Sequence, residues 1–208
     1  MIIQWLGQSC FKIQTKGSQG DIVVATDPYS DSSGLKMSHF NTDIITVSCD
    51  QENHNNIDAL RGEPFIIKNP GEYETKGVFV YGVSAVLDKE KTKATLYKII
   101  SEEISVAHLS DLSQPLTDDQ LDRLGNVDVL LLSVGGNLDV KKTTEIISQI
   151  DPRLVIPMNY KIASQKTTLN TADEFLKSCG LKSETMDKLK IAKKDLMTED
   201  TRVIVLTV

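Results

Sequence analysis

The chain has few cysteines, and they lie far apart. Cys10, Cys49 and Cys179 are an odd number in 208 residues, and no two of them form a C-x-x-C motif. Neither a disulfide framework nor a zinc ribbon is therefore expected, and unpaired thiols favour a reducing compartment. We expect a cytoplasmic protein that is long enough to bury a substantial core without disulfides or a structural metal.

The chain also has no long apolar run, no basic leader and no cluster of basic residues. No apolar stretch approaches the roughly 20 residues that a membrane helix needs, and nothing basic precedes Ile2–Trp5, so neither membrane insertion nor secretion is predicted. A net charge of -6 without clustered Lys and Arg argues against nucleic acid as the main partner. The expected partner is a small molecule or another protein, and the oligomeric state stays open.

The two halves of the chain differ in the secondary structure that their sequences predict. Short apolar runs closed by turn residues predict strands at 2–6, 10–14, 21–26, 43–48, 65–68, 78–87, 95–100 and 104–108. Helices then alternate with strands: helices at 117–125, 139–150 and 171–180, and strands at 127–134, 153–157 and 202–208. Thr117 and Thr171 are the expected N-caps of the first and third helices. This pattern predicts a layered α/β protein, and with no linker in the sequence we expect a single domain over 1–208.

Six short segments stand at the ends of these predicted elements. They are W-L-G-Q-S-C-F at 5–11, T-D-P at 26–28, P-G-E-Y-E at 70–74, H-L-S-D-L at 108–112, V-G-G at 134–136 and I-P-M-N-Y at 156–160. In order and spacing they resemble the metallo-β-lactamase fold superfamily, in its zinc-dependent hydrolase branch similar to L-ascorbate-6-phosphate lactonase. The resemblance implies an αββα four-layer sandwich, with two facing mixed sheets, outer helices and a metal cleft at one edge.

The metal-binding motif of that superfamily, H-x-H-x-D-H, is only partly present. Mapped onto the segment at 47–54, its two first histidines correspond to Cys49 and Gln51, its aspartate to Asn53, and its last histidine to His54. Active relatives use the imidazoles and carboxylates to hold zinc and to activate a bound water. Neutral amides suit zinc poorly, so the resemblance implies a largely dismantled metal site.

At other positions of the family pattern, some residues match and others differ. Asp111 matches the aspartate that bridges two metals in relatives, whereas Asn159 stands where relatives have a histidine. Ser110 replaces a usual glycine, and the roles of His108 and Glu72, which match the family pattern, are left open. With Gln8, the last two are candidate residues of the cleft. The pair Gly135-Gly136 follows a buried strand and is predicted to form a tight turn rather than a phosphate site.

Four hypotheses follow from these residues. The first is a catalytically impaired or inactive homologue, acting as a binding or regulatory module without a cofactor. The second is an active ester, lactone or phosphodiester hydrolase with weakly bound Zn or Mn on Cys49, His54 and Asp111. The third is a metal-free cleft for a sugar or nucleotide, lined by the amides of Gln8, Gln51, Asn53, Asn55 and Asn159. The fourth is a Cys49 nucleophile paired with His54, which needs a third group to orient the histidine; the ordinary interpretation of Cys49 is a small buried side chain.

Overall fold

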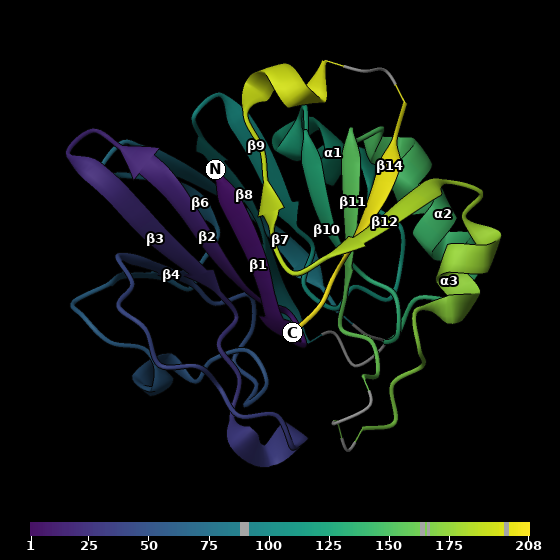
Figure 1. Cartoon of the computed structure of the whole chain (residues 1–208), viewed down its shortest axis with the longest axis horizontal. Helices are drawn as coiled ribbons and strands as arrows, with labels where there is room; N and C mark the ends of the chain where they lie inside the picture. Colours follow the sequence, from purple (N-terminus) through teal and green to yellow (C-terminus); the bar gives the residue numbers. More distant parts are fainter. Residues whose placement is uncertain (88–91, 163–164, 166, 198–199) are drawn as a thin grey trace.

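Two β-sheets lie face to face in this protein (Figure 1). The computed structural model describes residues 1–87, 92–162, 165, 167–197 and 200–208. One sheet has six strands in the order β13-β1-β2-β3-β4-β5, and the other has eight in the order β12-β14-β11-β10-β9-β8-β7-β6. Each contains parallel and antiparallel pairs. The expected pair of facing mixed sheets is confirmed.

The bounds of the elements follow chain order. The six-stranded sheet contains β1 (Ile2–Gly7), β2 (Cys10–Gly17), β3 (Gly20–Thr26), β4 (Ile44–Thr46), β5 (Phe65–Ile67) and β13 (Leu189–Lys190). The eight-stranded sheet contains β6 (Gly71–Thr75), β7 (Val78–Val86), β8 (Lys93–Ser101), β9 (Ile104–His108), β10 (Val129–Ser133), β11 (Leu154–Met158), β12 (Lys182–Met186) and β14 (Arg202–Leu206). The α-helices are α1 (Asp118–Leu124), α2 (Val140–Ile150) and α3 (Asp173–Ser178), and short 3-10 helices span Asp31–Ser33, Ile57–Ala59 and Lys193–Leu196.

The main core lies between the two sheets. Alternate residues of β1 and β2 point into it, because successive side chains of a strand face opposite ways. The indole of Trp5 stacks on Tyr160 with ring centroids 4.6 Å apart. Tyr97 of β8 crosses the interior, and its hydroxyl donates to the carbonyls of Val47 and Ile67, at 3.0 and 3.1 Å. These hydrogen bonds link the eight-stranded sheet to the end of β4 and to β5 of the other sheet.

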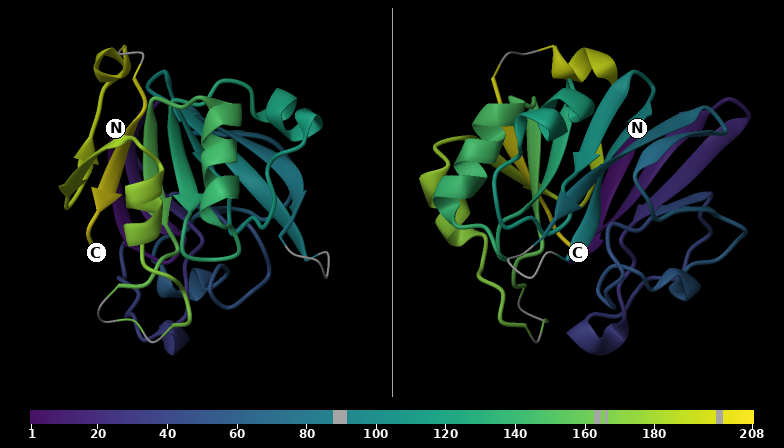
Figure 2. Two further views of the ribbon diagram at one scale, coloured as in Figure 1. Left: turned by 90° about the vertical axis from the view of Figure 1, so that its right-hand side faces the viewer. Right: turned by 180° about the vertical axis from the view of Figure 1, so that it is seen from behind.

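The outer layers differ on the two sides. The helices α1, α2 and α3 lie against the face of the eight-stranded sheet that points away from the other sheet (Figure 2). The six-stranded sheet is covered instead by the loops before and after β4, at 28–43 and 48–64. Phe40, Ile57 and Leu60 of these loops pack against Ala25, Ile45 and Val47 at β3 and β4. None of the described helices has the length and apolar character to cross a membrane.

The structure adds strands that the sequence analysis does not predict. β6 and β12 are the two edges of the eight-stranded sheet, and most of their residues are exposed. Their polar sequences carry no alternation of apolar residues, so pairing with β7 and β14 holds them in place. The strand expected at 43–48 is shorter, at Ile44–Thr46. The backbone N–H of Ser48 donates to the Asp27 side chain, in the site described below, instead of to a neighbouring strand.

The predicted cap of the third helix is wrong. α3 begins at Asp173 after Ala172, with no side-chain hydrogen bond at its N-cap, and the hydroxyl of Thr171 donates to the Asp173 carboxylate instead. The cap of α1 is confirmed. Thr117 accepts from the backbone N–H of Gln120, whose side chain accepts in turn from the backbone N–H of Thr117.

These two threonines give a matched pair of variants. We expect Thr117→Ala to lower the free energy of unfolding by about 1 kcal/mol, because it leaves a helix N–H without its acceptor. Thr171→Ala, which removes an exposed bond outside any cap, should change it by less than about 0.5 kcal/mol. Urea unfolding followed by circular dichroism measures both. Equal effects would show that the α1 cap contributes nothing particular.

Candidate functional site

Polar residues gather where strands of the two sheets end. β3 and β4 are parallel neighbours, as are β9, β10 and β11, so the carboxyl ends of each group lie at one edge. Hydrogen bonds from Ser48 join the two groups. Non-glycine residues with left-handed backbone stand at three of these ends, Asp27 (φ 40°), Ser110 (φ 54°) and Asn159 (φ 51°), and Gln8 (φ 50°) follows the end of β1. Strained backbone of this kind tends to cluster at functional sites.

Asp27 is the centre of the buried part of this edge. Its carboxylate accepts from the backbone N–H of Ser48 at 2.7 Å, from the Ser48 hydroxyl at 2.6 Å and from Nδ1 of His54 at 2.7 Å. The side chain is fully buried. Burial alone would raise the pKa of Asp27, but the charge of the His54 ring and the hydrogen bonds from His54 and Ser48 lower it below its ordinary value. Asp27 is therefore a buried carboxylate, stabilised by its partners.

His54 is a buried imidazolium held by this carboxylate. Burial opposes its charge, but the Asp27 carboxylate and, to a smaller extent, the Cys49 thiol favour it, and they raise the pKa of His54 to about 10. Nδ1 is engaged by Asp27, whereas the buried Nε2 has no hydrogen-bond partner. One ring nitrogen of the only histidine kept from the motif is thus committed to Asp27, and the other is left without a partner.

His108, at the end of β9, is neutral. Its Nε2 donates to the carbonyl of Ser9 at 2.8 Å, and its Nδ1 accepts from the backbone N–H of Ser110 at 3.2 Å. Burial lowers the pKa of His108, because its charged form would lose hydration. Both ring nitrogens are occupied by backbone groups, so His108 stabilises the turn that carries Ser110 and Asp111.

Ser110 joins the chain of hydroxyls that reaches Asp27. Its Oγ lies 2.7 Å from the Ser48 Oγ. Because the Ser48 hydroxyl gives its single proton to Asp27, Ser110 is the donor in this bond. Serine thus stands at a left-handed position that favours glycine, and its hydroxyl makes a contact that glycine could not make.

Asp111 and Asn159 belong to a second network at the same edge. The Ser133 hydroxyl donates to Asp111 at 2.7 Å, and the side-chain amide of Asn137 donates to the other Asp111 oxygen at 3.2 Å. The amide of Asn159 donates to the Ser133 hydroxyl at 3.3 Å. An added Cβ at Gly136 would collide with the Asp111 carboxylate. The predicted tight turn at Gly135-Gly136 therefore allows this close approach.

The other residues of the loop that follows β4 differ in solvent exposure. Cys49 is buried, with 6% of its surface exposed, whereas Gln51 is exposed and Asn53 is partly exposed. The carbonyl of Gln51 accepts from the backbone N–H groups of His54 and Asn55, which closes a tight turn. Gln8 is buried, and its side-chain nitrogen has no hydrogen-bond partner. The amides named in the cleft hypothesis therefore range from buried to exposed.

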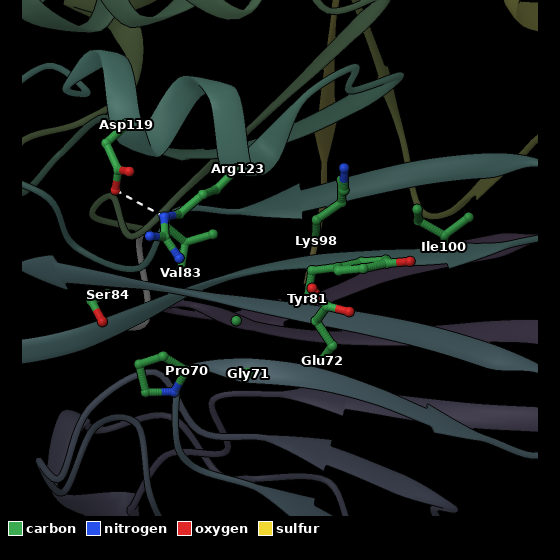
Figure 3. Close-up of a pocket in the computed structure, with 11 residues that line it drawn as sticks. Pro70, Gly71, Glu72, Tyr81, Val83, Ser84, Lys98, Ile100, Asp119 and Arg123 are labelled. Carbon is green, nitrogen blue, oxygen red and sulfur yellow. Dashed lines mark hydrogen bonds and ion pairs between the residues drawn. The ribbon is translucent and has the colours of Figure 1, made fainter.

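Glu72 lies in a surface cavity of roughly 710 Å³ formed by β6, β7, β8 and α1 (Figure 3). Around it are Tyr81 and Lys98, whose ammonium lies 5.2 Å from the Tyr81 ring centroid. On the α1 side, Arg123 is paired with Asp119 at 2.9 Å. The residues that line this cavity do not include His54, Asp111 or Asn159.

Comparison with known proteins identifies the family. Residues 2–159 match the family described as the beta-lactamase superfamily domain. The chain belongs to this superfamily. A protein from Thermotoga maritima, assigned to the Zn-dependent hydrolases of the metallo-beta-lactamase superfamily, superposes with a TM-score of 0.78 at 27% sequence identity, over 99% of this chain and 97% of that one. The fold is thus the metallo-β-lactamase fold.

Two further relatives agree with this assignment. The UPF0173 protein of Pyrococcus abyssi is 27% identical over 188 residues, which cover 77% of this chain and 83% of the relative. The metallo hydrolase Igni18 from Ignicoccus hospitalis superposes with a TM-score of 0.66 at 17% identity, over 99% of this chain and 94% of that one. The second likeness concerns the fold alone.

The side chains at this edge do not fit the metal centre that metallo-β-lactamase relatives imply. The unpartnered Nε2 of His54 is the kind of atom that a metal could use. However, Asp27 and Asp111 are bound to hydroxyl, amide and imidazole donors of the protein. Within the described part of the chain, no group of three or more His, Cys, Asp or Glu side chains could hold a metal ion. Cys49, His54 and Asp111 therefore do not form a ready-made ligand set.

The sequence analysis did not identify Asp27, the residue whose side chain is the centre of the buried hydrogen-bond network at this edge. Asp27 lies in the T-D-P segment, which counts as part of the resemblance but not as part of the site. Ser48 and Ser133 were missed as well. An aspartate that directly follows an apolar strand was the available signal, since a charge at such a position needs partners when it is buried.

The His54–Asp27 pair gives the folded protein a defined pH dependence. The pKa of His54 is raised to about 10 in the fold, against about 6.5 in an unfolded chain. The stability from its protonated form is fully present below pH ~6.5 and is lost as the pH rises through about 10. We expect the urea midpoint to fall between pH 6.5 and pH 10. The double variant Asp27→Asn/His54→Gln should show a flatter profile; parallel profiles would contradict the raised pKa.

Proposed function

We propose that this chain is a metallo-β-lactamase-fold protein that has lost metal-dependent hydrolysis and serves as a binding or regulatory module, without a resident metal. One observation carries the proposal. The polar side chains at the expected metal edge are hydrogen-bonded to one another, through Ser48 and Ser133, in two networks centred on Asp27 and Asp111. A ligand atom must be free to face a cation, and these atoms face donors of the protein.

The energetics point the same way. Loss of a single supporting partner typically costs a metal site about 10–100-fold in affinity. Here Gln51, Asn53 and Asn159 stand at positions where relatives have basic or charged ligands, and Gln51 is exposed. Without a held metal there is no water of lowered pKa to attack a carbonyl or phosphoryl group. The hydrolase activity in the names of the relatives is therefore not proposed for this chain.

The direct test is metal content before and after restoration of the family motif. The wild-type protein, purified without chelator and dialysed, is compared with the variant Cys49→His/Gln51→His/Asn53→Asp/Asn159→His. We expect substoichiometric zinc and manganese in the wild type and a marked gain of zinc in the variant, by mass spectrometry of the metals. Turnover of a panel of lactones, esters and phosphodiesters is measured on both proteins. The wild type should stay at background.

Near-stoichiometric zinc or manganese in the wild type, with turnover that a chelator abolishes, would overturn the proposal. In that case Cys49→Ser and His54→Ala identify the ligands. Loss of both metal and turnover in each variant would establish the mononuclear site on Cys49, His54 and Asp111. The matched control is Cys179→Ser, a cysteine of α3's C-cap that should leave metal content unchanged.

A further inference from the structure

The surface cavity that holds Glu72 carries charged side chains of both signs. Its lining includes two carboxylates, those of Glu72 and Asp119, and two cations, Lys98 and Arg123. On α1, Arg123 and Asp119 pair with each other through Nε and one carboxylate oxygen. Neither Glu72 of β6 nor Lys98 of β8 forms an ion pair with any residue that the structure describes. One cavity thus holds an unpaired negative charge and an unpaired positive charge.

The strand register places these two charges on either side of one aromatic ring. Glu72 lies opposite Tyr81 on β7, and Tyr81 lies opposite Lys98 on β8, so the three side chains form one row on the same face of the sheet. Figure 3 shows the Tyr81 ring between Glu72 and Lys98. Because neighbouring strands are about 4.8 Å apart, the backbones of the two charged residues are about 10 Å apart. A small molecule lying over the ring can therefore contact both charges.

The ammonium group of Lys98 is held in place without being neutralised. Its Nζ donates to the backbone carbonyl of Leu124, at the end of α1, and lies 5.2 Å from the Tyr81 ring centroid. Both contacts orient the ammonium, but neither supplies a full negative charge. Burial lowers the pKa of Lys98, because the partly buried ammonium loses hydration. A carboxylate beside Nζ would offset that loss, and an ammonium has three N–H donors, of which Leu124 takes one.

We propose that this cavity binds a small zwitterion of the α-amino-acid class, with the ligand ammonium on Glu72 and the ligand carboxylate on Lys98. The two charges of an α-amino acid are about 3 Å apart, and a hydrogen bond of about 2.8 Å at each end gives a span of about 9 Å. This span fits the separation of β6 and β8. Tyr81 and Ile100 line the same cavity and offer an apolar surface to the side chain of the ligand.

A ligand with a single charge fits this cavity less well. An amine would leave the ammonium of Lys98 without a counter-charge, and a carboxylate would leave Glu72 without one, so each loses one of two charge-assisted hydrogen bonds. The inference goes beyond the proposed function and rests on other residues, because the lining of this cavity includes neither Asp27 nor Asp111.

Isothermal titration calorimetry of the wild-type chain with each proteinogenic L-amino acid, at neutral pH and with chelator present, tests the proposal. We expect at least one amino acid to bind with a Kd of about 1 mM or below. Its carboxamide, which lacks the carboxylate charge, and its N-acetyl derivative, which lacks the ammonium, should each bind at least about tenfold more weakly. Absence of binding below a Kd of about 10 mM, or a derivative that binds as tightly as its parent, would overturn the proposal.

Two variants locate the bound amino acid in this cavity. Glu72→Gln and Lys98→Met each remove one charge at nearly constant size, and each should weaken binding of the amino acid by about tenfold. The matched control is Glu74→Gln, an exposed carboxylate of the same strand outside the cavity lining, which should leave the Kd unchanged. Circular dichroism verifies that each variant is folded. An unchanged Kd in Glu72→Gln or in Lys98→Met would overturn the assignment. Metal plays no part in these titrations, so the two proposals fail separately.

Discussion

Asp27→Asn is expected to lower the free energy of unfolding by about 3–5 kcal/mol, the usual consequence of breaking a buried ion pair from one side. Asp27 and His54 are both fully buried, and Oδ2 lies 2.7 Å from Nδ1. An amide at position 27 removes the charge that stabilises the imidazolium and turns one acceptor into a donor facing Ser48 and His54. Equilibrium urea unfolding at pH 6.5 measures the difference.

A matched control is Asp119→Asn on α1. Asp119 pairs with Arg123 at 2.9 Å, but the side chains of Arg123 and Asp119 are 65% and 72% exposed. Exposed pairs contribute little because water and salt screen them, so we expect a change within about 0.5 kcal/mol. If Asp27→Asn were as mild as this control, Asp27 would not be the stabilising centre of the site.

Gly135→Ala is expected to lower the free energy of unfolding by about 2–4 kcal/mol, through crowding of fixed backbone. A Cβ at this position would lie 2.5 Å from the Asn170 carbonyl oxygen, 2.6 Å from the Tyr160 Cα and 2.8 Å from the Asn159 carbonyl oxygen. The neighbouring backbone cannot move freely, because Asn170 donates to the Gly135 carbonyl at 3.0 Å and accepts from the backbone N–H of Lys161 at 2.9 Å. Thermal and urea unfolding report the loss.

Gly180→Ala separates crowding from backbone conformation. Gly180 has a φ of +69°, and an added Cβ would meet nothing within 4 Å. The substitution should therefore cost only the left-handed conformation, about 1–2 kcal/mol. A Gly135→Ala effect no larger than that of Gly180→Ala would mean that the turn relaxes, and that glycine is not required for the approach of Asn159 and Asn170.

Local sequence predicts most strands and the first two helices because their signals are local. The strand Ile104–His108 and the cap at Thr117 follow from apolar runs and from one reciprocal hydrogen-bonding pattern. The edge strands β6 and β12 escape prediction, because pairing with a neighbour rather than their own composition holds them in place. The cap predicted at Thr171 is wrong because the chain enters the helix one residue later than the motif suggests.

The sequence by itself determined the family of this protein and placed neutral amides at Gln51, Asn53 and Asn159, because both are matters of residue type and order. Only the tertiary structure decided where the surviving polar groups point. Asp27 and His54 are 27 residues apart, and Ser48 and Ser110 are 62 apart. Hydrogen bonds act over about 3 Å, and only the packing of two sheets brings such distant strand ends within that reach.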